Sequence, residues 1–115
     1  MFRSEAQRAR ACRALCRRAR RPEMWTDAGP TEVAIEIMEA NGGPLSSGER
    51  IVILAAWAFW NGCGGVSFAD VIERLDGPNL RAIAGLMQAL SSGGAAIDQW
   101  LATLEAELER EERRR

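Results

Sequence analysis

The three cysteines are the first candidates for chemistry, because thiolates bind metal ions and act as nucleophiles. Cys12 and Cys16 lie four residues apart, which places them on one face of a helix, and Cys63 lies in a predicted turn. Structural zinc sites combine closely paired cysteines with histidines or with further cysteines. The chain has no His. We therefore predict no metal site and interpret Cys12 and Cys16 as small packing residues.

The glycine-rich segment 62–65 precedes a predicted helix, where free backbone N–H groups could hold a phosphate. It follows a helix rather than a strand, and no Lys-Ser or Lys-Thr pair comes after it, so it does not match a nucleotide-binding P-loop. We interpret this segment as a plain turn between two helices.

Three residue types are missing, and their absence limits the catalysis that this chain could perform. There is no His and no Tyr, and all fifteen basic side chains are Arg. Glu32, Glu36 and Glu39 recur at helical spacing, but helical carboxylate sites pair inward-facing Glu with Glu-x-x-His. Asp70, with Glu73 and Asp76, stands near a glycine-rich turn, and nothing in the sequence orients these acids. We predict a protein that is not an enzyme and that holds no cofactor.

Basic charge is concentrated at the start of the chain. Residues 1–23 hold eight Arg and two Glu, whereas residues 24–115 hold seven Arg and fourteen acidic residues. Segment 3–21 fits a helix whose apolar face is mostly Ala, so we expect its burial to contribute little. Its arginines could bind nucleic-acid phosphates, an anionic membrane surface, or acids of this chain or of a partner. We rank pairing within the chain or with a partner protein first, nucleic acid second and a membrane third, and we expect contacts through Arg10, Arg13 and Arg17.

The composition changes at Met24, directly after Pro22 ends the helical pattern. This change divides the chain into an arginine-rich N-terminal extension or helix, residues 1–23, and a helical domain, residues 24–115. It leaves open whether the first segment belongs to the folded protein.

A helix-turn-helix outline covers residues 67–90, with a short helix at 67–75 and a second helix at 78–90. The second helix offers Arg81 and Gln88 for reading DNA, but the acidic charge around it repels phosphates. Trp60 is a further candidate for a partner contact, because Trp is frequent at the centres of protein interfaces. Packing in the core is the preferred interpretation for Trp60.

The most apolar stretch of the chain is Ile51–Trp60, inside a predicted central helix at residues 46–61. A helix that is apolar all round must be enclosed by other elements. Ser46 and Glu49 form a capping-box pattern at its start. Further helices are predicted at about 30–41, 67–75, 78–90 and from about residue 95 onward. The residues predicted to face the core are Val33, Ala34, Ile37, Met38, Phe68, Val71, Ile72, Leu75, Leu80, Ile83, Ala84, Met87, Leu90, Ile97, Trp100, Leu101, Leu104 and Leu108.

Three local features complete the prediction. Residues 24–29 are interpreted as a linker. Gly85 lies in mid-helix, which favours a close helix crossing at that point. The last helix becomes strongly charged from Glu105 onward, and we expect it to fray or project there. Together these elements predict an all-α fold, a compact bundle of about five core helices with an arginine-rich helix at its N-terminus.

The predicted function follows from these observations. No secretory signal is visible, the longest apolar run is too short to span a membrane, and the number of cysteines is odd, so we expect a cytoplasmic protein without a membrane partner. We predict a non-enzymatic helical module for protein–protein interaction, with self-association as one form of it. The alternative is a nucleic-acid-binding protein that uses the arginine-rich segment as an arm and residues 67–90 as a helix-turn-helix.

Overall fold

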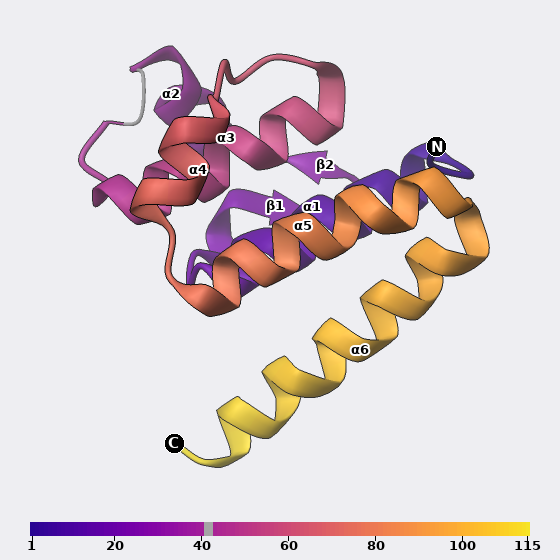
Figure 1. The fold of residues 1–115 in the computed structure, drawn as a ribbon. Helices are drawn as coiled ribbons and strands as arrows, with labels where there is room; N and C mark the ends of the chain where they lie inside the picture. Colours follow the sequence, from indigo (N-terminus) through magenta and orange to yellow (C-terminus); the bar gives the residue numbers. More distant parts are fainter. Residues whose placement is uncertain (41–42) are drawn as a thin grey trace.

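The computed structural model describes residues 1–40 and 43–115, and in these ranges the chain forms six α-helices and one small hairpin (Figure 1). The prediction of an all-α compact helical fold is confirmed. The predicted end of the helix at 30–41 falls outside the described residues. The elements in chain order are α1 (Glu5–Arg18), η1 (Pro22–Met24), β1 (Trp25–Thr26), β2 (Gly29–Pro30), α2 (Glu32–Glu39), α3 (Ser47–Asn61), α4 (Phe68–Arg74), α5 (Gly77–Ser92) and α6 (Gly94–Arg113).

Helix α1 lies at the centre of the fold, where it contacts α3, α5, α6 and the hairpin. The Ser4 hydroxyl caps its start by accepting a hydrogen bond from Gln7, and Arg17 and Arg18 complement the dipole at its end. The core has two hydrophobic clusters: α1 forms one with α3, α5 and α6, and the other with α2, α3 and the segment that contains Trp25. The buried apolar side chains of α1 are Ala9, Ala11, Cys12, Ala14, Leu15 and Cys16, and all of them except Leu15 are small. The division of the chain at residue 23 stays a prediction, although this helix is packed as deeply as any in the described structure.

Helix α3 is the predicted apolar helix, and its capping box at Ser46 and Glu49 is confirmed. Every residue from Ile51 to Trp57 is buried. Ala58 is exposed and the two residues after it are half-buried. The prediction of enclosure on every side therefore holds only to Trp57, because the last turn of α3 borders an open groove.

The predicted linker at 24–29 is an ordered hairpin, in which β1 and β2 pair antiparallel. Trp25 is buried against the edges of two other indoles, with ring centroids 5.1 Å from Trp57 and 6.1 Å from Trp60. Gly29, at a positive φ, lies directly against the Trp60 ring. The linker interpretation was wrong because burial of a large indole orders this segment, although its polar and glycine residues resemble a loop.

Val33 of α2 was predicted to face the core but is 44% exposed, because α2 buries only Ala34 and Ile37. Two further helices bury different faces from those predicted. Phe68 and Ile72, predicted to face inward, are 73% and 66% exposed, and α4 buries no residue. On α5, Met87 and Ala84 are exposed, and the buried residues are Ala82, Ile83, Leu86 and Ala89. The prediction was wrong at these positions because α5 packs mainly against α1 and α6, which rotates its buried face, whereas α4 packs mainly against α3.

Helix α6 remains helical to Arg113, so the expected fraying from Glu105 was wrong. Leu104 and Leu108 are buried against the core, which holds the charged half of the helix in place. The close crossing predicted at Gly85 is confirmed. A methyl group at Gly85 would lie 3.0 Å from Cδ1 of Trp100, and the Trp100 indole N–H donates a hydrogen bond to the carbonyl of Ala82 at 3.0 Å.

We predict that Gly64→Ala destabilises the protein by roughly 3 kcal/mol, whereas Gly65→Ala costs about 1 kcal/mol. Both glycines have positive φ, but a Cβ at Gly64 would collide with the carbonyl oxygen of Leu54, and one at Gly65 would meet nothing within 4 Å. Urea unfolding followed by circular dichroism measures both free energies of unfolding. Equal losses in the two variants would contradict the close approach of Gly64 to α3.

Candidate functional site

An apolar groove of about 260 Å³ runs between the last turns of α3, the helix α4 and the middle of α5. We call it the α3–α4–α5 groove. Its one polar lining residue is Ser67, whose hydroxyl accepts a hydrogen bond from the backbone N–H of Asp70 and so caps α4. The apolar lining residues are Ala55, Ala58, Phe59, Val66, Phe68, Val71, Ile83 and Met87.

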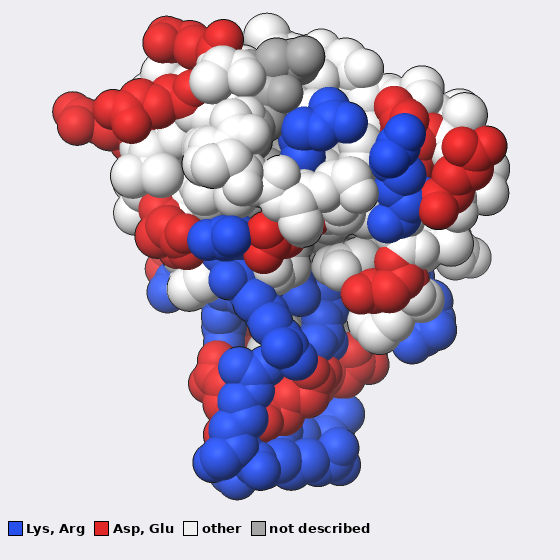
Figure 2. Space-filling model, turned by 90° about the vertical axis from the view of Figure 1, so that its left-hand side faces the viewer, with Lys and Arg blue, Asp and Glu red and all other residues white. Residues whose placement is uncertain are grey.

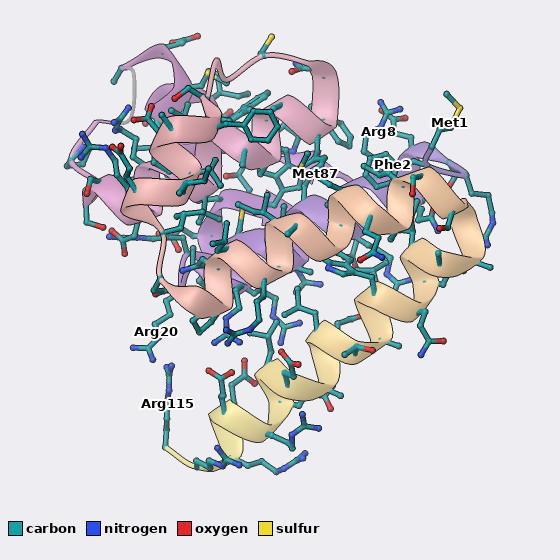
Figure 3. The ribbon with its side chains drawn as sticks, viewed as in Figure 1. Met1, Phe2, Arg8, Arg20, Met87 and Arg115 are labelled. Atoms are coloured by element: carbon teal, nitrogen blue, oxygen red, sulfur yellow. The ribbon has the colours of Figure 1, made fainter. Side chains whose placement is uncertain are left out.

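Large apolar side chains stand exposed at the rim of this groove. Phe68 and Met87 line the groove and are exposed, and Met87, which is 45% exposed, extends from α5 (Figure 3). Ile72 lies one turn after Phe68 on α4 and is also exposed. Exposed apolar residues that occur singly need no explanation, but a cluster of them around a hollow marks an interaction surface. Sequence analysis found these residues but assigned them to the core, because periodicity shows that a helix has an apolar face and not which neighbour covers it.

Trp60, a predicted partner contact, is engaged inside the fold. Its ring packs on Gly29 and against Trp25, and its carbonyl accepts a hydrogen bond from Arg8 Nη1 at 3.1 Å. The Arg8 guanidinium also lies over the ring of Phe2, 5.6 Å from its centroid. A positive charge at the end of α3 is favourable for the helix dipole, so Arg8 has a structural role there.

The other arginines of α1 are paired with acids of this chain. Arg10 lies 3.1 Å from Glu105, Arg13 lies 3.1 Å from Asp27, and Arg17 lies 3.4 Å from Glu112. Intramolecular pairing, ranked first from the sequence, is confirmed for these three predicted contact residues. Exposed pairs of this kind contribute little individually, but together they occupy the arginines that a free arm would offer to a partner.

Arg18 and Glu111 form the most enclosed of these ion pairs. The two terminal guanidinium nitrogens of Arg18, Nη1 and Nη2, donate to the two carboxylate oxygens of Glu111, and the Arg18 side chain is only 10% exposed. The hydrogen bond to Arg18 lowers the pKa of Glu111, and the same bond raises the pKa of Arg18. This bidentate pair joins the end of α1 to the end of α6.

Gln7 joins the opposite ends of the same two helices, and sequence analysis missed it. This buried amide donates hydrogen bonds to the carbonyl of Gly94 at 2.9 Å and to Asp98 Oδ1 at 3.0 Å. Arg3 donates to the other carboxylate oxygen of Asp98, which lowers the pKa of Asp98. The available signal was a single amide on a helix face otherwise made of small apolar residues.

A second hollow, of about 740 Å³, lies between α5 and α6, and we call it the α5–α6 groove. Two predicted contact residues, Arg81 and Gln88, line it together with Arg110, Arg114 and the half-buried Trp100. The structure therefore brings Arg81 and Gln88 together, whereas Arg10, Arg13, Arg17 and Trp60 lie outside this groove.

The three cysteines are not gathered in one place. Cys12 and Cys16 are buried in the core cluster beneath the tryptophans, and Cys63 is exposed. The Cys12 thiol donates a hydrogen bond to the carbonyl of Ala56 at 3.3 Å. Within residues 1–40 and 43–115, the structure brings together no three Cys, Asp or Glu side chains in an arrangement that could bind a metal ion.

Comparison of the chain with protein-family models, with curated proteins and with solved structures finds no match. None of the helices in the described ranges has both the length and the apolar character required to cross a membrane. We therefore infer function from the two grooves and from the charges around them.

We predict that one thiol per folded chain reacts quickly with an aromatic disulfide reagent, and that two react only after unfolding. Burial raises the pKa of Cys12 to about 12 and raises the pKa of Cys16 well above its usual value. The absorbance of the released thiolate counts the reactive cysteines with and without denaturant. Cys63→Ser should remove the fast reaction, and a fast reaction that persists in this variant would contradict the burial of the other two.

We predict that the free energy of unfolding falls as the pH is lowered from about 6 to 3. Ion pairs with Arg18, Arg21 and Arg3 lower the pKa values of Glu111, Glu49 and Asp98, respectively. A carboxylate whose pKa is lower in the folded chain than in the unfolded chain stabilises the fold at every pH above its pKa in the unfolded chain. This contribution is lost as the pH falls through its pKa in the folded chain. Denaturant unfolding at several pH values measures this dependence.

The matched variants for this experiment are Glu111→Gln and Glu73→Gln. Glu111→Gln removes one of the three linked carboxylates and should flatten the pH dependence, whereas Glu73 is exposed and has no ion-pair partner among the described residues. Equal flattening in both variants would show that the Arg18–Glu111 pair does not contribute to stability in this way.

Proposed function

We propose that this chain is a non-enzymatic helical module for protein–protein interaction, and that its partner at the α3–α4–α5 groove is a second copy of itself. The exposure of Phe68 is the observation that carries the proposal. An aromatic ring that is three-quarters exposed beside an apolar hollow is stabilised when a partner removes both from water.

Self-association is favoured because the projecting side chains and the hollow lie on the same patch. A two-fold contact requires a self-complementary surface, in which each copy offers what the other receives. Here the exposed Phe68 lines the groove together with Val71, Ile83 and Met87, and Ile72 is exposed one turn further along α4. Two copies related by a two-fold axis near α4 would therefore insert their Phe68 rings into each other's grooves.

Charge on the exposed part of α4 agrees with this arrangement. The helix carries both signs, with Glu73 beside Arg74, and Arg74 already lies 3.4 Å from Asp70. When α4 meets a second α4 in the opposite direction, acidic and basic side chains can face each other across the axis, so charge does not oppose the contact. The cytoplasmic location expected from the sequence, with all three cysteines unpaired, is part of the same proposal.

We predict that the wild-type chain forms a dimer and that Ile72→Asp converts it to a monomer. A carboxylate at this exposed position would have to be desolvated in the contact, whereas α4 buries no residue that the substitution could disturb. Sedimentation velocity and light scattering over a concentration series up to about 0.5 mM measure the assembly state, a range that covers weak self-association.

The matched control is Ile35→Asp on α2, where the side chain is also exposed but lies away from the groove. This variant should remain a dimer, and circular dichroism should show that both variants are folded. A wild-type chain that is monomeric at the highest concentration, or two variants that dissociate equally, would overturn the proposal.

A further inference from the structure

Positive charge gathers at the end of the molecule where α1 and α6 terminate side by side (Figure 2). We call this surface the arginine end. Seven arginines lie there with four glutamates of α6, Glu107, Glu109, Glu111 and Glu112, so arginines outnumber glutamates at this end although the whole chain has a net charge of −1. Its arginines are Arg17, Arg18, Arg20, Arg110, Arg113, Arg114 and Arg115.

Most arginines of this surface have no carboxylate partner. Seven of the fifteen arginines in the chain form ion pairs within 4.0 Å, and eight form none among the described residues. Five of those eight belong to the arginine end, and all five are exposed: Arg20, Arg110, Arg113, Arg114 and Arg115. The helix dipoles favour positive charge at these helix ends, but they leave the guanidinium groups free for a ligand.

The backbone presents Arg20 toward this surface. Arg20 has a φ of +62°, a left-handed conformation that is uncommon for a residue with a side chain. It is held there by hydrogen bonds from its own N–H to the carbonyl of Arg17 and from the N–H of Arg21 to the carbonyl of Cys16. Its side chain reaches toward Arg115 at the end of α6 (Figure 3).

A hollow of about 180 Å³ lies between these two side chains. The two carboxylates that line it, Glu111 and Glu112, are already engaged by Arg18 and Arg17. The hollow therefore offers positive charge from Arg20 and Arg115 without an unengaged acid between them.

The α5–α6 groove extends this surface along the molecule, because the small hollow and the groove share Arg18 and Glu111 as lining residues. The groove is also lined by three arginines that form no ion pair among the described residues and by two amide side chains, and its two acids are Glu107 and Glu111, of which Glu111 is engaged by Arg18. These arginines and amides are Arg81, Arg110, Arg114, Gln88 and Gln99. Proteins that bind a nucleic-acid backbone commonly do so with a positively charged groove that runs along the phosphates.

We infer that the arginine end and the α5–α6 groove bind the phosphodiester backbone of a nucleic acid without reading its bases. An arginine guanidinium group can donate two parallel hydrogen bonds to two oxygens of one phosphate, and several guanidinium groups of this surface form no ion pair among the described residues. The indole N–H of Trp100, the aromatic residue of the groove, is already bonded to the carbonyl of Ala82 and is therefore not available to a base. This site shares Arg81 and Gln88 with the helix-turn-helix expected from the sequence, and Arg17, Arg18 and Arg20 with the expected arm, but it adds the end of α6.

A membrane surface fits these observations less well. Stable attachment to lipid combines basic residues with large apolar side chains that enter the bilayer. The large apolar residues that are exposed in the described structure are Met1, Val33, Ile35, Phe68, Ile72 and Met87, and none belongs to the arginine end. Leu108, which lines the small hollow, is buried.

Fluorescence anisotropy tests the inference with a labelled mixed-sequence oligonucleotide of about 20 nucleotides, single-stranded and as a duplex, over a series of KCl concentrations. We expect both forms to bind at low salt. The logarithm of the binding constant should fall linearly with the logarithm of the salt concentration, because phosphate contacts release counterions. The double variant Arg114→Gln/Arg115→Gln should bind roughly tenfold more weakly and reduce the salt slope by about two.

The matched control is Arg13→Gln/Arg50→Gln, which removes the same charge at residues that line neither the small hollow nor the α5–α6 groove, and which should change binding less than about twofold. Ile72→Asp should also retain binding, because Ile72 lines neither hollow of this surface, so failure of the proposed self-association is distinguishable from failure here. Equal loss in the two double variants, or no binding at low salt, would overturn the inference. So would tighter binding to vesicles rich in phosphatidylserine, or to polyglutamate, than to the oligonucleotide.

Discussion

The packing of α3, α5 and α6 around α1 depends on the small size of the side chains that α1 buries. Ala9, Ala11 and Ala14, with Cys12 and Cys16, let neighbouring backbones approach closely, so one helix contributes to both core clusters. Small residues contribute little hydrophobic free energy themselves. Their role is to admit Leu15 and the large residues of α3, α5 and α6, which supply most of the buried apolar area. A larger side chain on this face would separate helices that now share a core.

The arginines of α1 follow from the same constraint. When the buried face of a helix consists of small residues, neighbouring helices pack close to its backbone. The long side chains at the edges of this face must then extend to solvent or to acidic residues on the next helix. The glutamates of α6 meet them there, and the enclosed Arg18–Glu111 pair with the Gln7–Asp98 hydrogen bonds joins both ends of the two helices. Five of the eight arginines that form no ion pair among the described residues lie where both helices end.

The positions of the helices, their caps and the arginine–glutamate pairing could be predicted, because each depends on neighbours along the chain or on charge. The Ser46–Glu49 box and the crossing at Gly85 are of this kind. The apolar groove could not be predicted, because the face of Phe68 and Met87 has the same periodicity as a core face. Whether such a face is covered depends on where other helices pack. The burial of Trp25 also depends on its packing neighbours, which place it in the core although the sequence around it is typical of a linker.

Helix α5 separates the two proposed surfaces, and this separation has a consequence for how they would work together. Ile83 and Met87 line the α3–α4–α5 groove, whereas Arg81 and Gln88 line the α5–α6 groove. Occupation of one groove therefore leaves the other accessible. A dimer joined through α4 would carry two arginine ends on one rigid particle. A polyanion long enough to contact both arginine ends would dissociate only when it is released from both at the same time. Dimerisation would therefore raise the apparent affinity for the polyanion without any new contact.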